Sequence, residues 1–156
     1  MISGLTNGHA MESRELHRLL AKVHRMHCKC SSGPLAGIGI TQGQPRILHH
    51  LSVHDGCIQK EFSRQFDLEP ATVTNILSIM EDNGLVRREY DPADRRILRV
   101  FLTAKGRQAH ARVEDIFASL EEVCFRGFPE QDKAFLIARL KDVYENLKKA
   151  QESKVP

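Results

Sequence analysis

The stretch that decides the fold reads PATVTNILSIMEDNGLVRREYDPADRRILRVFLTAKG and covers residues 70–106. It begins with Pro70, a residue that suits the first turn of a helix. Apolar residues then recur at helical spacing until Asn83-Gly84 supplies a helix stop signal. Two runs typical of β-strands follow, at 85–90 and 97–103, joined by a turn-rich segment. This order predicts a helix that leads into a β-hairpin.

Helical patterns also flank this stretch on both sides. A first helix is predicted over 12–30, ended by Ser31-Ser32-Gly33-Pro34 and followed by a glycine-rich loop to Gly39. Further helices are predicted at 42–54, 58–66, 106–125 and 130–149. Three residues separate the helix at 58–66 from the one that begins at Pro70. Two helices joined by so short a turn, and followed by a basic hairpin, indicate a winged helix-turn-helix. The predicted fold class is mainly α with a small β-hairpin wing.

Size and composition set the broad class. A chain of 156 residues has the length of one domain, and 28% charged residues is an ordinary globular value. There is no apolar run long enough to span a membrane, and the first residues do not resemble a secretory signal. Four cysteines are too few for a disulfide scaffold. We therefore expect a soluble, cytoplasmic protein with no membrane partner.

The basic charge is concentrated in one segment. The whole chain carries a net charge of +3, whereas residues 84–107 hold seven basic residues against three acidic ones. The predicted hairpin is therefore the basic part of the molecule. By contrast, no Lys or Arg lies between Gln65 and Val86. Attraction to a polyanion would have to come from the hairpin and from Arg46, Lys60 and Arg64.

Four motifs in the middle of the chain resemble the multiple antibiotic resistance regulator (MarR) family of winged helix-turn-helix transcription factors. They are Ala-Thr-Val-Thr at 71–74, Met-Glu-Asp-Asn-Gly-Leu-Val-Arg-Arg at 80–88, Asp-Pro-Ala-Asp-Arg-Arg at 91–96 and Leu-Thr-Ala-Lys-Gly at 102–106. The resemblance implies a homodimeric transcriptional regulator, commonly a repressor, that binds a pseudo-palindromic operator in double-stranded DNA. It also implies N- and C-terminal dimerisation helices, at 1–40 and 106–156, around a DNA-binding region at 41–105 that shares one structural domain with them.

Two groups of side chains are the candidate DNA contacts. The first lies on the predicted recognition helix, whose N-terminal residues meet base edges in a helix-turn-helix, and comprises Thr72, Thr74, Asn75 and Ser78. The second belongs to the hairpin and comprises Arg87, Arg88, Asp94, Arg95 and Arg96. The family resemblance implies that Arg96 enters a minor groove while Asp94 holds its side chain. Solvated helix and hairpin positions are the alternative for both groups.

The resemblance also implies release from DNA by a small molecule, a metal or an oxidant. A phenolic or similar effector would bind between the dimerisation helices and the winged region, where the candidates are Leu16, Leu20, His24, Ile47 and His50. Core packing is the alternative for the aliphatic members of this set.

Soft metal ligands cluster near the end of the first predicted helix. His24 and Cys28 are four residues apart and His27 and Cys30 three apart, so each pair shares a helix face. The cluster could bind zinc or copper, with further ligands from His49, His50, His54, Cys57 or His110 in the folded dimer. It could also sense oxidants, or be structural, and we expect no resident cofactor.

Two other functional classes were weighed. An enzyme is not expected, because the chain holds no phosphate-binding glycine loop and no nucleophile motif. A winged helix that docks a protein partner and binds no DNA is the remaining alternative. A steep salt dependence of binding to duplex DNA would separate the two classes.

Overall fold

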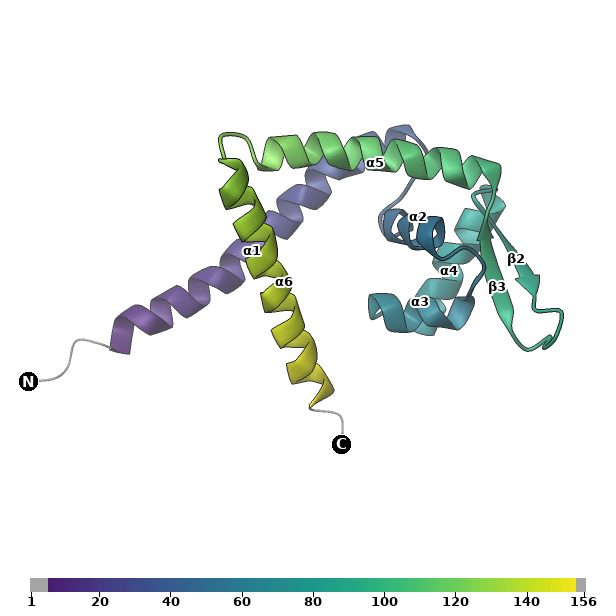
Figure 1. The fold of residues 1–156 in the computed structure, drawn as a ribbon, viewed down its shortest axis with the longest axis horizontal. Coiled ribbons are helices and arrows are strands. Elements are labelled where there is room, and N and C mark those ends of the chain that lie inside the picture. The colour runs from purple at the N-terminus through teal and green to yellow at the C-terminus, as the bar shows by residue number, and fades with distance from the viewer. Residues whose placement is uncertain (1–5, 154–156) are drawn as a thin grey trace, which may run out of the picture. The chain divides into compact units, whose positions relative to one another are not determined.

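The computed structural model describes the backbone of residues 6–153 and the side chains of residues 15–153. The chain divides into two compact units, one that runs to Ala118 and one that begins at Ser119. The helices are α1 (Thr6–Gly37), α2 (Gln44–Val53), α3 (Gln59–Phe66), α4 (Pro70–Asp82), α5 (Ala104–Cys124) and α6 (Glu130–Glu152). The strands are β1 (Cys57–Ile58), β2 (Val86–Tyr90) and β3 (Leu98–Leu102). Figure 1 shows β2 and β3 as a hairpin beside α4. The predicted fold class is confirmed.

The sheet has one strand more than the predicted hairpin. Its order is β1-β3-β2, with both neighbouring pairs antiparallel. In the hairpin Val86 pairs with Leu102, and on the other side of β3 Cys57 pairs with Val100. Two residues are too few to show an alternating pattern, which is why residues 57–58 were not predicted as a strand. Through β1, the hairpin is anchored directly before α3.

The core of the first unit holds α4 in place. Leu48 of α2, Phe62 of α3, Leu77 of α4 and Val100 of β3 are all fully buried in one cluster. Of the apolar stripe predicted for the recognition helix, Val73, Leu77 and Met80 are buried, and the fourth member, Ile76, is half-buried against the same core. The opposite face of α4 is therefore directed away from the core.

The predicted end of the first helix is wrong, because α1 passes through Pro34 and ends at Gly37. A proline inside a helix costs about 3 kcal/mol, since it removes one backbone hydrogen bond. Continuing the helix buries Leu35 to 2% exposure, and burying such a side chain contributes about 1.5–3 kcal/mol. The actual stop is Gly39, at a φ of 74°, after which the Ile40 amide donates to the Leu35 carbonyl at 2.9 Å. Burial of Leu35 thus offsets much of the cost of Pro34, and the helix continues through the local breaker signal.

Gly106 lets α5 begin against the end of the recognition helix. A Cβ at this position would lie 2.0 Å from the carbonyl oxygen of Leu85. The Thr103 hydroxyl donates to the Gly84 carbonyl at 2.6 Å and accepts the Gly106 amide at 3.0 Å. The turn after α4, the end of β3 and the first turn of α5 are therefore locked together.

Apolar side chains on α1 and on α6 remain exposed. On α1, in the first unit, Leu16, Leu19, Val23 and Met26 are each more than half exposed. In the second unit, Lys133 of α6 pairs with Glu121 at 2.8 Å, and no residue of α6 is buried. Exposed apolar residues of α6 include Phe135, Leu136, Leu140, Tyr144 and Leu147. Among the described residues, no helix is long and apolar enough to cross a membrane.

Candidate nucleic-acid interface

The N-terminal turn of α4 presents polar side chains away from the core. Pro70 occupies the first turn, and Thr72 and Asn75 are exposed. The four backbone amides at a helix N-terminus have no partner within the helix, and they attract anions such as phosphate. Asn75 can pair with adenine, and threonine can contact several bases. Two of the predicted recognition residues thus lie where a duplex could reach them.

Thr74 is exposed as well, but its hydroxyl is occupied. It donates to the Pro70 carbonyl at 2.9 Å and accepts the Nε2 amide of Gln59 at 3.2 Å. What remains for a ligand is the methyl group and one lone pair. Sequence reasoning did not identify Gln59, whose position at the start of α3 gives no signal of this contact. Its Oε1 atom is buried and has no hydrogen-bond partner among the described residues.

The wing tip holds Arg96 in an extended, exposed position. Its Nε and Nη2 atoms each donate to one carboxylate oxygen of Asp94 at 2.9 Å, while 91% of the side chain is exposed. The pKa of Asp94 is lowered from its ordinary value by these hydrogen bonds, and the pKa of Arg96 is raised. The pair that the family resemblance implied is present. Arg95 beside it is exposed and makes no ion pair with any described residue.

A buried carboxylate makes the wing tip rigid. Asp91 Oδ1 accepts the Ala93 amide at 2.8 Å, and Oδ2 accepts Nε of Arg99. This hydrogen bond lowers the pKa of Asp91 below its ordinary value. Arg99 also donates to the Gly56 carbonyl at 3.0 Å, which ties the wing to the segment before α3. Arg99 is therefore a structural arginine.

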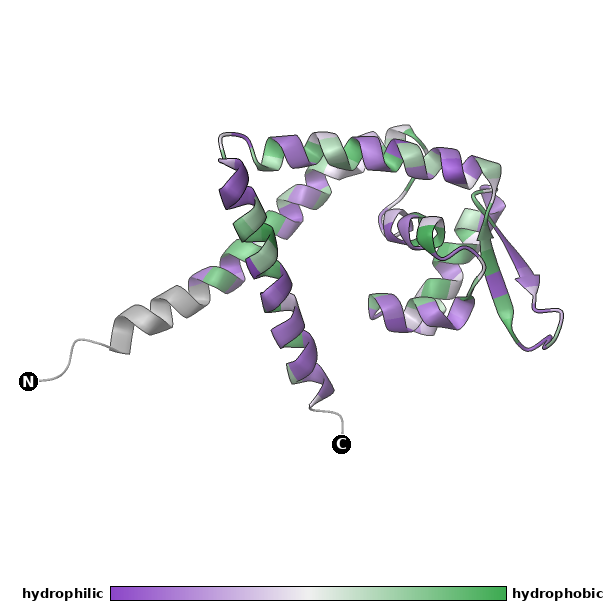
Figure 2. Ribbon diagram, in the orientation of Figure 1, coloured by the Kyte–Doolittle hydropathy of each residue, from purple (hydrophilic) through white to green (hydrophobic). Residues whose placement is uncertain are grey.

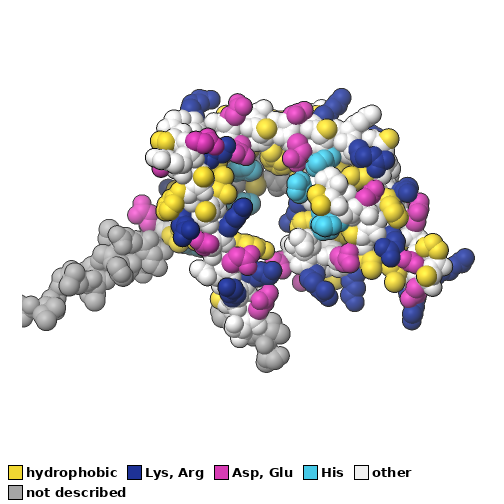
Figure 3. Space-filling model, viewed as in Figure 1, with side chains coloured by type: hydrophobic (Ala, Val, Ile, Leu, Met, Phe, Trp, Pro, Cys, Tyr) yellow, Lys and Arg dark blue, Asp and Glu magenta, His cyan; other side chains and the backbone are white. Residues whose placement is uncertain are grey.

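One groove brings side chains from α3, α4 and the wing to a common surface. It measures about 300 Å³, and its walls include Lys60 of α3, Thr74 of α4 and Arg96 of the wing. Figure 3 shows dark blue Lys and Arg side chains over α3 and at the wing tip, and Figure 2 shows the loop between β2 and β3 as hydrophilic. The other two cations predicted to attract DNA lie elsewhere: Arg46 and Arg64 line different cavities.

Two of the predicted DNA contacts are engaged inside the chain. Arg88 donates from Nε to Glu81 at 2.9 Å and from Nη2 to the Ser78 hydroxyl at 3.2 Å, and its side chain is 18% exposed. This pairing lowers the pKa of Glu81. Arg88 and Ser78 thus join β2 to α4. Arg87 is half exposed, pairs with Glu89 at 3.1 Å and lies over the ring of Phe101.

The predicted effector residues do not share one pocket within the chain. Leu16 and Leu20 are exposed, and Ile47 is fully buried in the core. His24 lines a cavity of about 690 Å³, whereas His50 lines a different one of about 510 Å³. Ile47 is therefore a core residue. Core packing was the alternative given above for the aliphatic effector candidates. The larger cavity also reaches Thr72 and Ile76 of the recognition helix.

The predicted metal or redox cluster is only partly assembled. The Sγ atom of Cys28 lies 3.8 Å from Nε2 of His24, so that pair is in contact. His27 instead stacks on Phe117, with 6.0 Å between ring centroids, and Cys30 is exposed. A different group of potential ligands, His49, His110 and Glu114, is brought together by α2 and α5. The spacing of four residues between His110 and Glu114 is the sequence signal that could have revealed the two members of this group that lie on α5.

A model of the MarR family matches residues 40–98, the segment that carries α2, α3, α4 and most of the wing. This match places the winged helix-turn-helix segment of the chain in the MarR family. Its predicted class, a winged helix-turn-helix transcriptional regulator, is thereby confirmed, and this family comprises regulators, not enzymes.

Two curated relatives are transcriptional regulators by name. The transcriptional regulator HosA of Escherichia coli O111:H- is 48% identical over 83 residues, which are 53% of this chain and 62% of HosA. The HTH-type transcriptional repressor IacR of Pseudomonas putida is 27% identical over 128 residues, 82% of this chain and 77% of IacR.

Solved structures share the fold over most of the chain. A MarR transcriptional regulator from Methanosarcina mazei Go1 superimposes with a TM-score of 0.81 at 26% identity, covering 88% of this chain and 99% of that one. The complex of S. aureus MepR with DNA has the same fold, with a TM-score of 0.75 at 23% identity over 83% of this chain and 96% of MepR.

Proposed function

We propose that this MarR-family protein is a homodimeric repressor that binds a pseudo-palindromic DNA operator. The observation that carries the proposal is the shared groove of Lys60, Thr74 and Arg96. A duplex that receives the N-terminus of α4 in its major groove also meets Lys60 at its phosphates and the wing at the adjacent minor groove. The relative IacR, a repressor by name, supports the direction of regulation.

Each DNA-contacting group has a distinct task in this proposal. Thr72 and Asn75 read base edges, and the methyl group of Thr74 contacts a thymine methyl, because the Thr74 hydroxyl is occupied. Arg96 enters the minor groove, where its guanidinium is attracted by the negative potential. Asp94 preorganises Arg96 through two hydrogen bonds, so less conformational freedom is lost when DNA binds.

The exposed apolar residues of α1 and α6 provide the dimer interface in this proposal. Stripes of leucine, valine and aromatic residues left in water are typical of surfaces that bind another subunit. A two-fold dimer presents its two recognition helices about 34–36 Å apart, which is one turn of DNA. The operator then consists of two inverted half-sites whose centres are one helical turn apart.

The cavity of about 690 Å³ is the proposed effector site. Its walls combine apolar groups, including Leu35 and Phe117, with the cationic Arg46. Such a lining suits a small aromatic acid, the size of which is compatible with this volume. Because Thr72 and Ile76 also line the cavity, a ligand there would displace the start of the recognition helix.

Footprinting tests the DNA-binding geometry. An operator is first selected from a random duplex library, and hydroxyl-radical cleavage is then mapped in the presence of the protein. The expected pattern is two protected segments about one helical turn apart, with further minor-groove protection outside them where the wings bind. Failure to select any sequence at low salt would instead favour a wing that docks protein, and would refute the proposal.

A further inference from the structure

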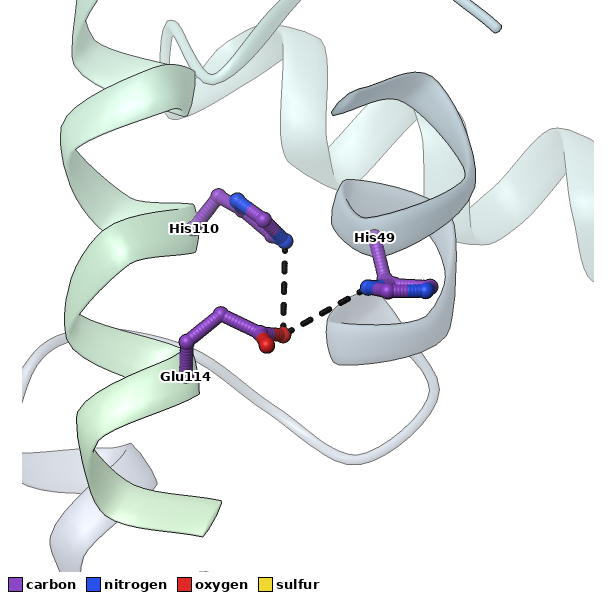
Figure 4. Close-up of side chains that lie close together, drawn as sticks. All are labelled: His49, His110 and Glu114. Atoms are coloured by element: carbon purple, nitrogen blue, oxygen red, sulfur yellow. Dashed lines mark ion pairs between the residues drawn. The ribbon is translucent and has the colours of Figure 1, made fainter. Parts of the chain in front are cut away.

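Three potential metal ligands converge between α2 and α5. His49 comes from α2, and His110 and Glu114 come from successive turns of α5, as Figure 4 shows. Glu114 Oε1 lies 3.5 Å from His49 Nδ1 and 3.4 Å from His110 Nε2. All three potential ligand atoms lie within 4.8 Å of one another. The DNA-binding surface uses none of these side chains.

The separations of these atoms match those around a tetrahedral ion. Zinc binds histidine nitrogen at about 2.0–2.1 Å and carboxylate oxygen at about 2.0–2.2 Å, so two of its ligands lie about 3.3–3.5 Å apart. The two distances from Glu114 already have this value. The two imidazoles need only a small closing movement, and His49 is 63% exposed on the surface, so its side chain has room to adjust.

His110 supplies an independent observation. Its Nε2 atom is buried and has no hydrogen-bond partner in the part of the chain that the structure describes. Its 3.4 Å approach to Glu114 does not satisfy the geometry of a hydrogen bond. An unsatisfied buried nitrogen is costly in a native protein, and a metal ion is one of the partners that can satisfy it. The lone pair of neutral Nε2 is the usual donor of histidine to zinc.

We propose that His49, His110 and Glu114 form a binding site for one divalent metal ion per chain, of which Zn²⁺ is the best match. Two nitrogens and one carboxylate oxygen suit this borderline-soft ion, and such a three-ligand set leaves one tetrahedral position for solvent. The bound ion links α2, which packs in the winged region, to α5. It therefore restrains two helices that are separated by 50 residues of sequence.

Zinc titration of the metal-depleted protein against a chromophoric chelator tests the site. The expected result is one ion per chain and a higher midpoint of thermal unfolding with zinc than without it. His49→Asn and Glu114→Gln each remove one ligand from an exposed position, so neither should impair folding, and each should weaken zinc binding at least tenfold. Matched controls are His17→Asn and Glu122→Gln, which change exposed residues outside the cluster and should leave zinc affinity unchanged.

Cobalt substitution identifies the ligands spectroscopically. A tetrahedral Co²⁺ ion bound by His49, His110 and Glu114 gives visible absorption bands without a near-ultraviolet thiolate charge-transfer band. These bands should be lost in Glu114→Gln and retained in Cys28→Ser. A thiolate band that disappears in Cys28→Ser would place the ion at the His24–Cys28 pair and overturn the proposal. Zinc affinity unchanged in both ligand variants, or no stoichiometric binding, would overturn it as well.

Discussion

Arg88 and Arg96 lie on the same hairpin, eight residues apart, but the structure gives them opposite roles. Arg96 is 91% exposed and forms its ion pair with Asp94, whereas Arg88 is 18% exposed and joins β2 to α4 through Glu81 and Ser78. We therefore predict that alanine at position 96 impairs DNA binding and spares the fold. Alanine at position 88 should impair the fold first.

The expected loss of DNA affinity in Arg96→Ala and the expected loss of stability in Arg88→Ala are both large enough to measure. A groove contact of the kind proposed for Arg96 is worth a factor of about 5–150 in affinity, and a dimer loses two of them in Arg96→Ala. Its thermal midpoint should be unchanged, because an exposed ion pair contributes little to stability. In Arg88→Ala several hydrogen bonds to a charged partner are lost, and Glu81 is 37% exposed and can rehydrate. The expected cost is about 1–2 kcal/mol of unfolding free energy.

Fluorescence anisotropy with the selected operator and urea unfolding of each variant provide the two readouts. Arg96→Lys separates charge from geometry, because lysine keeps the charge but cannot form the two-pronged contact with Asp94. The reasoning would be refuted by an Arg96→Ala protein that binds the operator as tightly as the parent chain. It would also be refuted by an Arg88→Ala protein of unchanged stability.

Three further predictions follow from the same structure. Gly106→Ala should lower the free energy of unfolding by about 1–3 kcal/mol, because the added Cβ would overlap the Leu85 carbonyl oxygen. An unchanged midpoint of urea unfolding would contradict this prediction. Burial, with a smaller contribution from Glu61, raises the pKa of Cys57 to about 11. Alkylation followed by mass spectrometry should therefore modify Cys57 far more slowly than the exposed Cys124 at pH 8, and equal rates would be the contrary result. Arg88 lowers the pKa of Glu81 from 4.5, so the ionised carboxylate stabilises the fold. The stability advantage over Glu81→Gln should be full above about pH 4.5 and shrink as the pH falls through the lowered pKa, and a constant difference in acid would contradict the pairing.

Local periodicity was sufficient to predict the helices, the hairpin and the buried stripe of the recognition helix. It failed where tertiary burial competed with a local signal. Pro34 predicts a helix end, yet α1 continues to bury Leu35. It also failed for β1, whose two residues become a strand only because β3 lies beside them.

The candidate site was predictable at the level of elements and less so at the level of side chains. The sequence places Thr72, Asn75 and Arg96 on the recognition helix and the wing, and the structure exposes all three. The sequence alone does not show that Glu81 binds Arg88, because the two residues are seven positions apart and lie on different elements. His49 and Glu114 likewise meet only because the tertiary structure brings these two side chains together from α2 and α5.

The most direct test of the central claim is the salt dependence of operator binding, measured together with the number of protomers bound. If Lys60, Arg95 and Arg96 of both protomers approach the duplex, the logarithm of the association constant should fall with the logarithm of salt concentration at a slope of about −4 to −6. Sedimentation of the complex should show two protomers on one duplex. A slope near zero, or a single protomer bound with full affinity, would contradict the account of a dimer that binds DNA through the recognition helix and the wing.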